Sequence, residues 1–291
     1  MCLAMGLLPV GDAISKALAG HASPAEVTFW RLCAQAAFFL PVAVVMRRHL
    51  RGSILSLHAA VSALLLIVVT LSLVTAFAVM PIATAIFFVE PLFLTILAGP
   101  LLSERSGPRR YAAVAVGLVG ALIVLRPNFV AFGPVVLLPV LAALAYALNM
   151  IVMRRATRDR SALSFQFGAT LWAAGFMAGA HLVSGALGVP QTGLGALPSW
   201  APWAILLSGA LAMVTFLLIA FAFSKAEASS LAPFQFLEIV GATAVGFIVF
   251  AEVPDALTVL GTSIILGSGI YVFQRERAQR VDSPAAQPVE R

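Results

Sequence analysis

Charged residues are scarce in this chain. Asp, Glu, Lys and Arg make up only 10% of its 291 residues, whereas soluble domains carry roughly 25%. Apolar residues account for 61% of the sequence, and the mean hydropathy is +1.02. This composition excludes an ordinary soluble domain and indicates a protein that lies in a membrane.

Cysteines and catalytic motifs are also few. The two cysteines, Cys2 and Cys33, stand in apolar surroundings, so no disulfide framework is expected. The sequence contains no HExxH, CxxC, GxSxG or GxxxxGK[ST] motif. We therefore predict a protein that is not an enzyme and that has no metal or cofactor. The missing phosphate-binding loop means that ATP-driven transport would require another subunit.

Long, continuously apolar runs fill most of the chain. A hydrocarbon core about 30 Å thick needs roughly 20 apolar residues per helix, and barrel strands would instead alternate in short segments. We therefore predict an all-α integral membrane protein with ten transmembrane helices. The predicted spans are 2–19, 27–46, 58–79, 82–102, 111–126, 134–153, 162–184, 203–223, 233–251 and 256–273.

Basic residues fall in alternate gaps between these runs. Fifteen of the eighteen Lys and Arg residues follow even-numbered spans. Cytoplasmic loops carry such an excess, so we predict both termini in the cytoplasm and a multi-pass protein of the bacterial inner membrane. Basic clusters beside apolar spans suit a lipid bilayer and not a nucleic acid, despite the net charge of +6. The tail 280–291 is predicted to be disordered.

The two halves of the chain resemble each other. A shift of 148 residues aligns Glu90 with Glu238 and also Glu104 with Glu252. Chance matching of apolar sequence is the alternative, but two acid pairs at one shift favour a repeat. Each half holds five predicted spans, an odd number, so the halves enter the membrane in opposite senses. Inverted repeats are typical of secondary transporters, whose solute site lies between the halves.

One motif identifies a family. The stretch 88–120, FVEPLFLTILAGPLLSERSGPRRYAAVAVGLVG, is similar to the EamA domain of drug/metabolite transporters, with Pro91, Glu104 and Gly120 in its characteristic places. A second copy covers 237–268. The resemblance implies ten helices in two inverted five-helix EamA repeats, 1–126 and 134–273, with both termini inside. It also implies transport of a small metabolite, often export of amino acids or related compounds.

Ionisable residues inside predicted spans are the candidate site residues, because they are costly in a membrane and usually face a cavity or a partner. Asp12 and Lys16 lie one turn apart on the first helix. They are predicted either to line a cavity and contact a zwitterionic solute, or to form a static pair. Arg31 is expected to reach the lipid headgroups or to pair with Glu26. The alternative is that it binds a solute carboxylate.

Glu90 is the strongest candidate. Pro91 follows it and loosens the helix there, so the carboxylate could bind a solute amine or a proton. The alternative is a protonated Glu that is hydrogen-bonded to a neighbouring helix. Glu238 occupies the equivalent place in the second half, with Gln235 close by in sequence. Protons are therefore the candidate coupling ion.

Polar side chains in the sixth span complete the predicted substrate-binding set. Tyr146 and Asn149 are included because this span is the repeat partner of the first, although interhelical hydrogen bonding is the commoner use of such groups. We predict a secondary transporter that works by alternating access, with export of an amino acid favoured. The alternatives are an importer of a vitamin or other metabolite and a lipid flippase. The expected partners are a small molecule and the bilayer, and the oligomeric state is left open.

Overall fold

The computed structural model describes most of the chain. It covers residues 1–80, 83–102, 108–226, 231, 234–235, 237–251, 253 and 255–281. Glu104 and Glu252, the second aligned acid pair, therefore lie outside the described residues, and so does nearly all of the predicted tail.

The described residues form a helical protein without strands. Three short 3-10 segments, η1 (Arg47–His49), η2 (Gly133–Val136) and η3 (Leu194–Ala196), occur between the helices. The helices are α1 (Cys2–Ala19), α2 (Pro24–Val45), α3 (Leu57–Val79), α4 (Ala83–Phe87), α5 (Glu90–Leu102), α6 (Pro108–Phe132), α7 (Leu137–Ala156), α8 (Ala162–Ala186), α9 (Ala201–Lys225), α11 (Leu237–Phe250) and α12 (Ala256–Val281).

Six segments of the described chain are helical, long and apolar enough to cross a membrane. They are Cys2–Ala19, Pro24–Val45, Leu57–Val79, Ala83–Leu102, Val130–Ala156 and Ala201–Lys225. Two shorter apolar helical stretches, Leu237–Phe250 and Ala256–Ser268, lie in the second half. The chain is thus a multi-pass helical membrane protein, and the count of ten spans stays a prediction.

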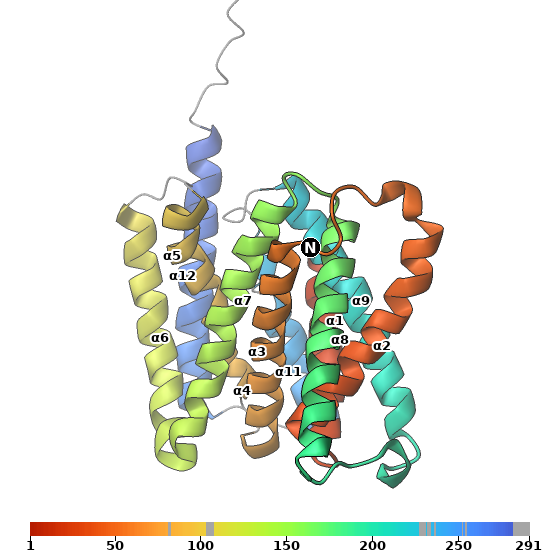
Figure 1. Cartoon of the computed structure of the whole chain (residues 1–291). Coiled ribbons are helices and arrows are strands. Elements are labelled where there is room, and N and C mark those ends of the chain that lie inside the picture. The colour runs from red at the N-terminus through yellow and green to blue at the C-terminus, as the bar shows by residue number, and fades with distance from the viewer. Residues whose placement is uncertain are drawn as a thin grey trace, which may run out of the picture.

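The packing of the helices follows an internal two-fold pattern. Helices α1, α2, α3, α5 and α6 correspond to α7, α8, α9, α11 and α12. The contact of α3 with α7 matches that of α9 with α1, and α5 with α7 matches α11 with α1. Helices α2 with α8 and α6 with α12 pair with their own equivalents. In Figure 1, α1 runs downward from the N-terminus whereas α7 runs upward, so the two halves are inverted.

The predicted fourth span is broken next to Glu90. Helix α4 ends at Phe87 and α5 begins at Glu90, with a turn at Phe88 and Val89 between them. Pro91 has no N–H to donate to the carbonyl of Phe87, which interrupts the helical ladder at this point. The first turn of a helix tolerates proline, so α5 restarts there. The loosened geometry predicted from Pro91 is confirmed as a break between two helices.

Small residues bring α6 and α12 together. A Cβ added to Gly120 would lie 2.8 Å from the carbonyl oxygen of Gly261, and one added to Gly117 would lie 2.5 Å from Ser268 Oγ. The absence of a side chain at Gly117 and Gly120 thus allows the close approach of the two helices. Gly267 on α12 differs, because an added Cβ there would meet no atom of the described residues within 4 Å.

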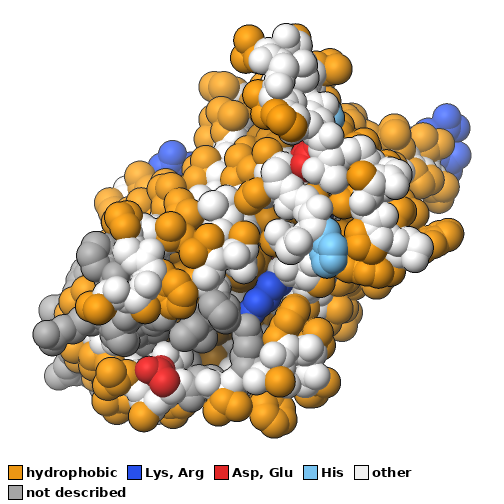
Figure 2. Space-filling model, turned by 90° about the horizontal axis from the view of Figure 1, so that it is seen from below, with side chains coloured by type: hydrophobic (Ala, Val, Ile, Leu, Met, Phe, Trp, Pro, Cys, Tyr) orange, Lys and Arg blue, Asp and Glu red, His pale blue; other side chains and the backbone are white. Residues whose placement is uncertain are grey.

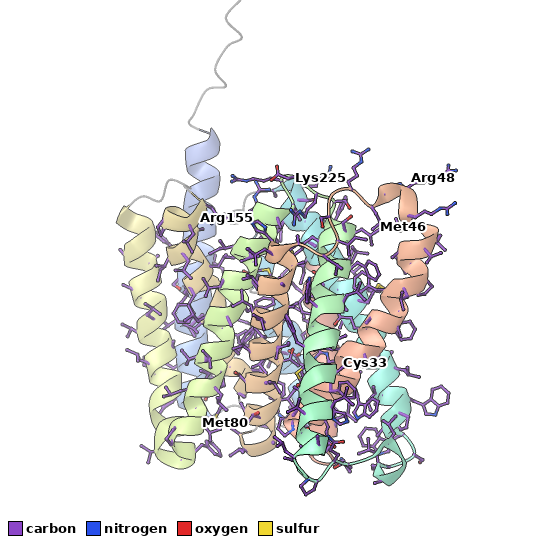
Figure 3. All side chains as sticks on the ribbon, viewed as in Figure 1. Cys33, Met46, Arg48, Met80, Arg155 and Lys225 are labelled. Carbon is purple, nitrogen blue, oxygen red and sulfur yellow. The ribbon has the colours of Figure 1, made fainter. Side chains whose placement is uncertain are left out.

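The two ends of the helical bundle differ in charge. Figure 3 shows Arg48, Arg155 and Lys225 together at the upper end, which we call the basic end, and Met80 at the opposite end. The guanidinium of Arg154 donates to the Phe223 carbonyl at 2.7 Å, and that of Arg155 donates to the Leu101 carbonyl. Arginine side chains thus bind carbonyls in the last turns of α9 and α5, which ties α7 to both helices at the basic end.

Candidate functional site

A cavity of about 620 Å³, the large cavity, lies between the first helix and the last two. Its walls come mainly from α1, α11 and α12, with α4 and the end of α3. Most of the lining is apolar, and Asp12 and Lys16 place charge in it. The C-terminal parts of α1 and α11 and the start of α12 lie at the end opposite the basic end (Figure 1), so the large cavity extends toward that end. Figure 2, which views this end, shows few charged side chains and a basic one in a hollow near the centre.

Lys16 also contacts an aromatic ring of the large cavity. Its Nζ lies 4.6 Å from the centroid of the Phe250 ring, at the C-terminal end of α11. A cation over a ring face is attracted by about 0.5–2 kcal/mol, depending on hydration. Of the two alternatives left open for Asp12 and Lys16, the structure favours the one in which both side chains line a cavity.

A second cavity of about 30 Å³, the small cavity, lies deeper between the two halves. Asp12 and Phe77 line both cavities. The polar residues that line the small cavity are Asp12, Ser15, Arg31, Thr70, Tyr146 and Glu238. These residues come from α1, α2, α3, α7 and α11, so helices of both repeats meet at this point.

Arg31 lies inside the protein and not at its surface. The side chain is only 9% exposed, and its guanidinium donates to Ser15 Oγ at 2.8 Å. Ser15 Oγ donates in turn to the carbonyl of Gly11 at 3.0 Å. Arg31 also interacts electrostatically with Asp12. The expectation that Arg31 reaches headgroups or pairs with Glu26 is therefore wrong, because the polar face of α1 turns toward α2 and binds the guanidinium.

Glu26 has other partners at the start of α2. Its carboxylate accepts hydrogen bonds from the backbone N–H and the hydroxyl of Ser23, at 3.2 and 2.7 Å, and from the backbone N–H of Thr192. The Ser23 hydroxyl accepts from the backbone N–H of Glu26, which completes a capping box. Glu26 thus links the start of α2 to the long loop between α8 and α9.

The two aligned acids occupy equivalent places in the structure. Glu90 lies in the first turn of α5 and Glu238 in the first turn of α11, and both are buried. The positive end of a helix dipole favours a carboxylate at such a position. Glu238 interacts electrostatically with both Glu90 and Asp12, so three acids from two repeats form one cluster.

Gln235 lies beside Glu90, but the pair does not line either cavity. The Gln235 amide is close enough to the Glu90 carboxyl for the two groups to interact. Within the described part of the chain, Glu90 Oε1 and both polar atoms of the Gln235 amide are buried without a hydrogen-bond partner. Buried groups of this kind are rare and call for an explanation such as bound water or an ion.

Tyr146 faces the acid cluster. Its ring packs between Phe87 and Phe216, with centroid separations of 5.7 and 6.5 Å. Its hydroxyl is buried and has no hydrogen-bond partner among the described residues. Asn149, one turn further along α7, instead accepts a hydrogen bond from the Ser62 hydroxyl of α3 at 2.6 Å. For Asn149 the structure thus shows the interhelical contact that was the alternative to a place in the site.

Sequence reasoning missed most of the polar lining on α12. Thr258, Thr262 and Ser263 all border the large cavity, and Thr258 Oγ1 is buried without a partner among the described residues. Thr258 and Thr262 are four residues apart, so they lie on one face of the helix. This spacing, which can be read from the sequence, could have identified the two threonines as residues of one polar helix face.

Comparison with known proteins identifies the family. The model of the EamA-like transporter family matches residues 2–126 and again 133–274. The chain belongs to the EamA-like transporter family. It is therefore a membrane transporter and not an enzyme, and the two matched segments account for the two inverted halves.

Several relatives of this EamA-like transporter match two thirds or more of its length. The S-adenosylmethionine uptake transporters of Rickettsia prowazekii and Rickettsia bellii are 28% and 29% identical over 92% and 91% of this chain and 89% of theirs. A riboflavin transporter of Rhizobium johnstonii is 29% identical over 67% of this chain and 62% of its own. A protein of known crystal structure, with 15% sequence identity, superposes with a TM-score of 0.65 over 96% of both chains, which shows a shared fold.

Proposed function

We propose that this EamA-like transporter is a gradient-driven carrier of a small organic metabolite that bears positive charge, such as S-adenosylmethionine. The single observation that carries this proposal is the large cavity, with Asp12 in its wall and the other acids behind it. Its volume of about 620 Å³ falls within the roughly 300–1,000 Å³ of small-molecule sites.

The chemistry of the walls suits a substrate with an amino-acid group, a cation and a planar ring. The Asp12 carboxylate attracts an ammonium or sulfonium group, and the Lys16 ammonium attracts a carboxylate. Phe88, Phe247 and Phe250 line the same cavity and offer rings for stacking on a planar base. An uncharged substrate such as riboflavin would use the rings but would make no ionic contact with the Asp12 carboxylate.

The relatives bear on the direction of transport. Two of them are named for uptake of S-adenosylmethionine, which favours import over the amino-acid export predicted from the sequence. The basic end corresponds in our proposal to the cytoplasmic face, and the hydrogen bonds of Arg154 and Arg155 keep the helices together there. Alternating access would break these bonds, close the large cavity at the opposite end and open it at the basic end.

Uptake into proteoliposomes tests the proposal. Labelled S-adenosylmethionine should enter saturably, and unlabelled riboflavin or amino acids should compete weakly. Asp12→Asn removes the charge from the cavity wall and should lower uptake by at least about tenfold, which corresponds to one lost charge contact of roughly 1.4 kcal/mol. Asp159→Asn, the same change at an exposed loop residue, is the matched control and should transport normally.

Each contrary outcome selects another candidate. Strong competition by amino acids or riboflavin, with weak competition by S-adenosylmethionine, would change the substrate class. No flux of any of these solutes from folded protein would contradict metabolite transport and would leave a lipid flippase to be tested with labelled phospholipid.

A further inference from the structure

The small cavity is polar and large enough for water. Its volume of about 30 Å³ exceeds the roughly 10–15 Å³ that one water molecule needs. A buried water also needs two to four polar partners. The Tyr146 hydroxyl is one such partner, because it is buried and has no other partner among the described residues. The Asp12 and Glu238 carboxyls and the Arg31 guanidinium border the same space.

The two acids of the small cavity have different access to solvent. Asp12 lines both cavities, whereas Glu238 lines only the small one. Asp12 belongs to the first repeat and Glu238 to the second. A water in the small cavity would therefore lie between Asp12, which also lines the large cavity, and Glu238, which is only 4% exposed and does not line it.

The charged groups that face Glu238 favour the binding of a proton at this place. The acids Asp12, on α1, and Glu90, on α5, act on it electrostatically, and Arg31, on α2, acts on Asp12. Lys16 lies one turn beyond Asp12, at the large cavity. Three neighbouring carboxylates repel one another, and Arg31 supplies one positive charge at the small cavity itself.

We propose that the small cavity is the proton site of this carrier, in which one proton passes between Glu238 and Asp12 through a bound water held by Tyr146. The Glu238 carboxyl gives its proton to the water, and the water gives one of its own protons to a carboxylate oxygen of Asp12. One O–H bond breaks and one forms at each step, and the water is regenerated. Arg31 is a positioning residue that keeps Asp12 anionic until a substrate cation or the proton arrives.

This proposal rests on the proposed function, since it makes the proton the coupling ion of the same transporter. Uptake driven by an imposed pH gradient and exchange of labelled for unlabelled substrate are measured in the same proteoliposomes. The ratio of gradient-driven uptake to exchange, taken for each variant by itself, is the readout. Glu238→Gln removes the proton-carrying group, and Tyr146→Phe removes only the hydroxyl while it keeps the ring.

We expect Glu238→Gln and Tyr146→Phe to differ from the unaltered protein in the ratio of gradient-driven uptake to exchange. The ratio falls by about tenfold or more for Glu238→Gln and for Tyr146→Phe, in line with the contribution of a positioned proton-transfer group. Asp159→Asn keeps the ratio of the unaltered protein. Exchange that persists in the unaltered protein without any response to the pH gradient would overturn the proton site while leaving the carrier function intact.

A second measurement needs no transported substrate. Infrared difference spectra of the purified protein between low and high pH should contain a protonated-carboxyl band that Glu238→Gln removes and Tyr146→Phe shifts. If Glu238→Gln leaves the carboxyl bands unchanged, Glu238 does not exchange a proton, and the proposal is wrong even where no solute has yet been found.

Discussion

The approach of α6 and α12 at Gly120 gives a stability prediction that can be worked out from the structure. In Gly120→Ala the new Cβ would lie 2.8 Å from the Gly261 carbonyl oxygen and 2.9 Å from Ile264 Cβ. Ordinary carbon contacts are about 3.5–4.0 Å long, so the helices must separate. Such overpacking costs about 1–3 kcal/mol, and alanine returns about 0.8–1.0 kcal/mol of helix propensity. The net expectation is a loss of about 0–2 kcal/mol.

Gly267→Ala is the matched control, because it makes the same change on α12 at a position where an added Cβ would meet none of the described atoms within 4 Å. It should gain up to about 1 kcal/mol of helix propensity. The two variants should therefore differ by about 1–3 kcal/mol, and each kcal/mol shifts the unfolding midpoint of a domain of this size by about 2–4 °C. Thermal unfolding of the detergent-purified proteins measures the difference. Equal midpoints, or a more stable Gly120→Ala, would refute the proposed packing of α6 on α12.

Three further predictions concern other contacts and the orientation. Asn149→Ala leaves the buried Ser62 hydroxyl without its acceptor and should cost about 1–3 kcal/mol; a double-mutant cycle with Ser62→Ala that shows no coupling would contradict this. Ser23→Ala removes the side-chain cap of α2 and should cost about 0.5–2 kcal/mol in the same unfolding assay, so an unchanged midpoint would argue against the cap. With both native cysteines replaced by Ser, Asp159→Cys should react with an impermeant maleimide only from the cytoplasmic side, and labelling from outside would reverse the predicted orientation.

The helical fold and its repeat were predictable because they depend on local and periodic signals. Apolar run lengths predicted the helices, and the shift that aligns Glu90 with Glu238 predicted the two halves. Pro91 predicted the break at Glu90 because a missing N–H acts within its own helix. The number of spans and the cytoplasmic position of the termini are still predictions, which rest on the apolar run lengths and on the distribution of the basic residues.

The interior of the site was less predictable, because it depends on which helix faces turn toward each other. Arg31 looked like a surface anchor in the sequence, and only the contact of α1 with α2 brings Ser15 and Asp12 to it. Thr258 and Thr262 line the large cavity because of the rotation of α12 about its own axis. The packing of α12 against Gly120 fixes this rotation. The same rotation turns Gly267 to a place where an added Cβ would meet no described atom within 4 Å.

Blocking the large cavity tests the central claim most directly. Thr262→Trp on α12 places an indole in the cavity wall, whereas Ile270→Trp, two turns further along the same helix, replaces a side chain that is 50% exposed. If the large cavity is the path of the substrate, Thr262→Trp lowers S-adenosylmethionine uptake by more than about tenfold, a loss of at least 1.4 kcal/mol, and Ile270→Trp transports normally. Uptake that survives Thr262→Trp undiminished in folded protein would show that the substrate takes another route.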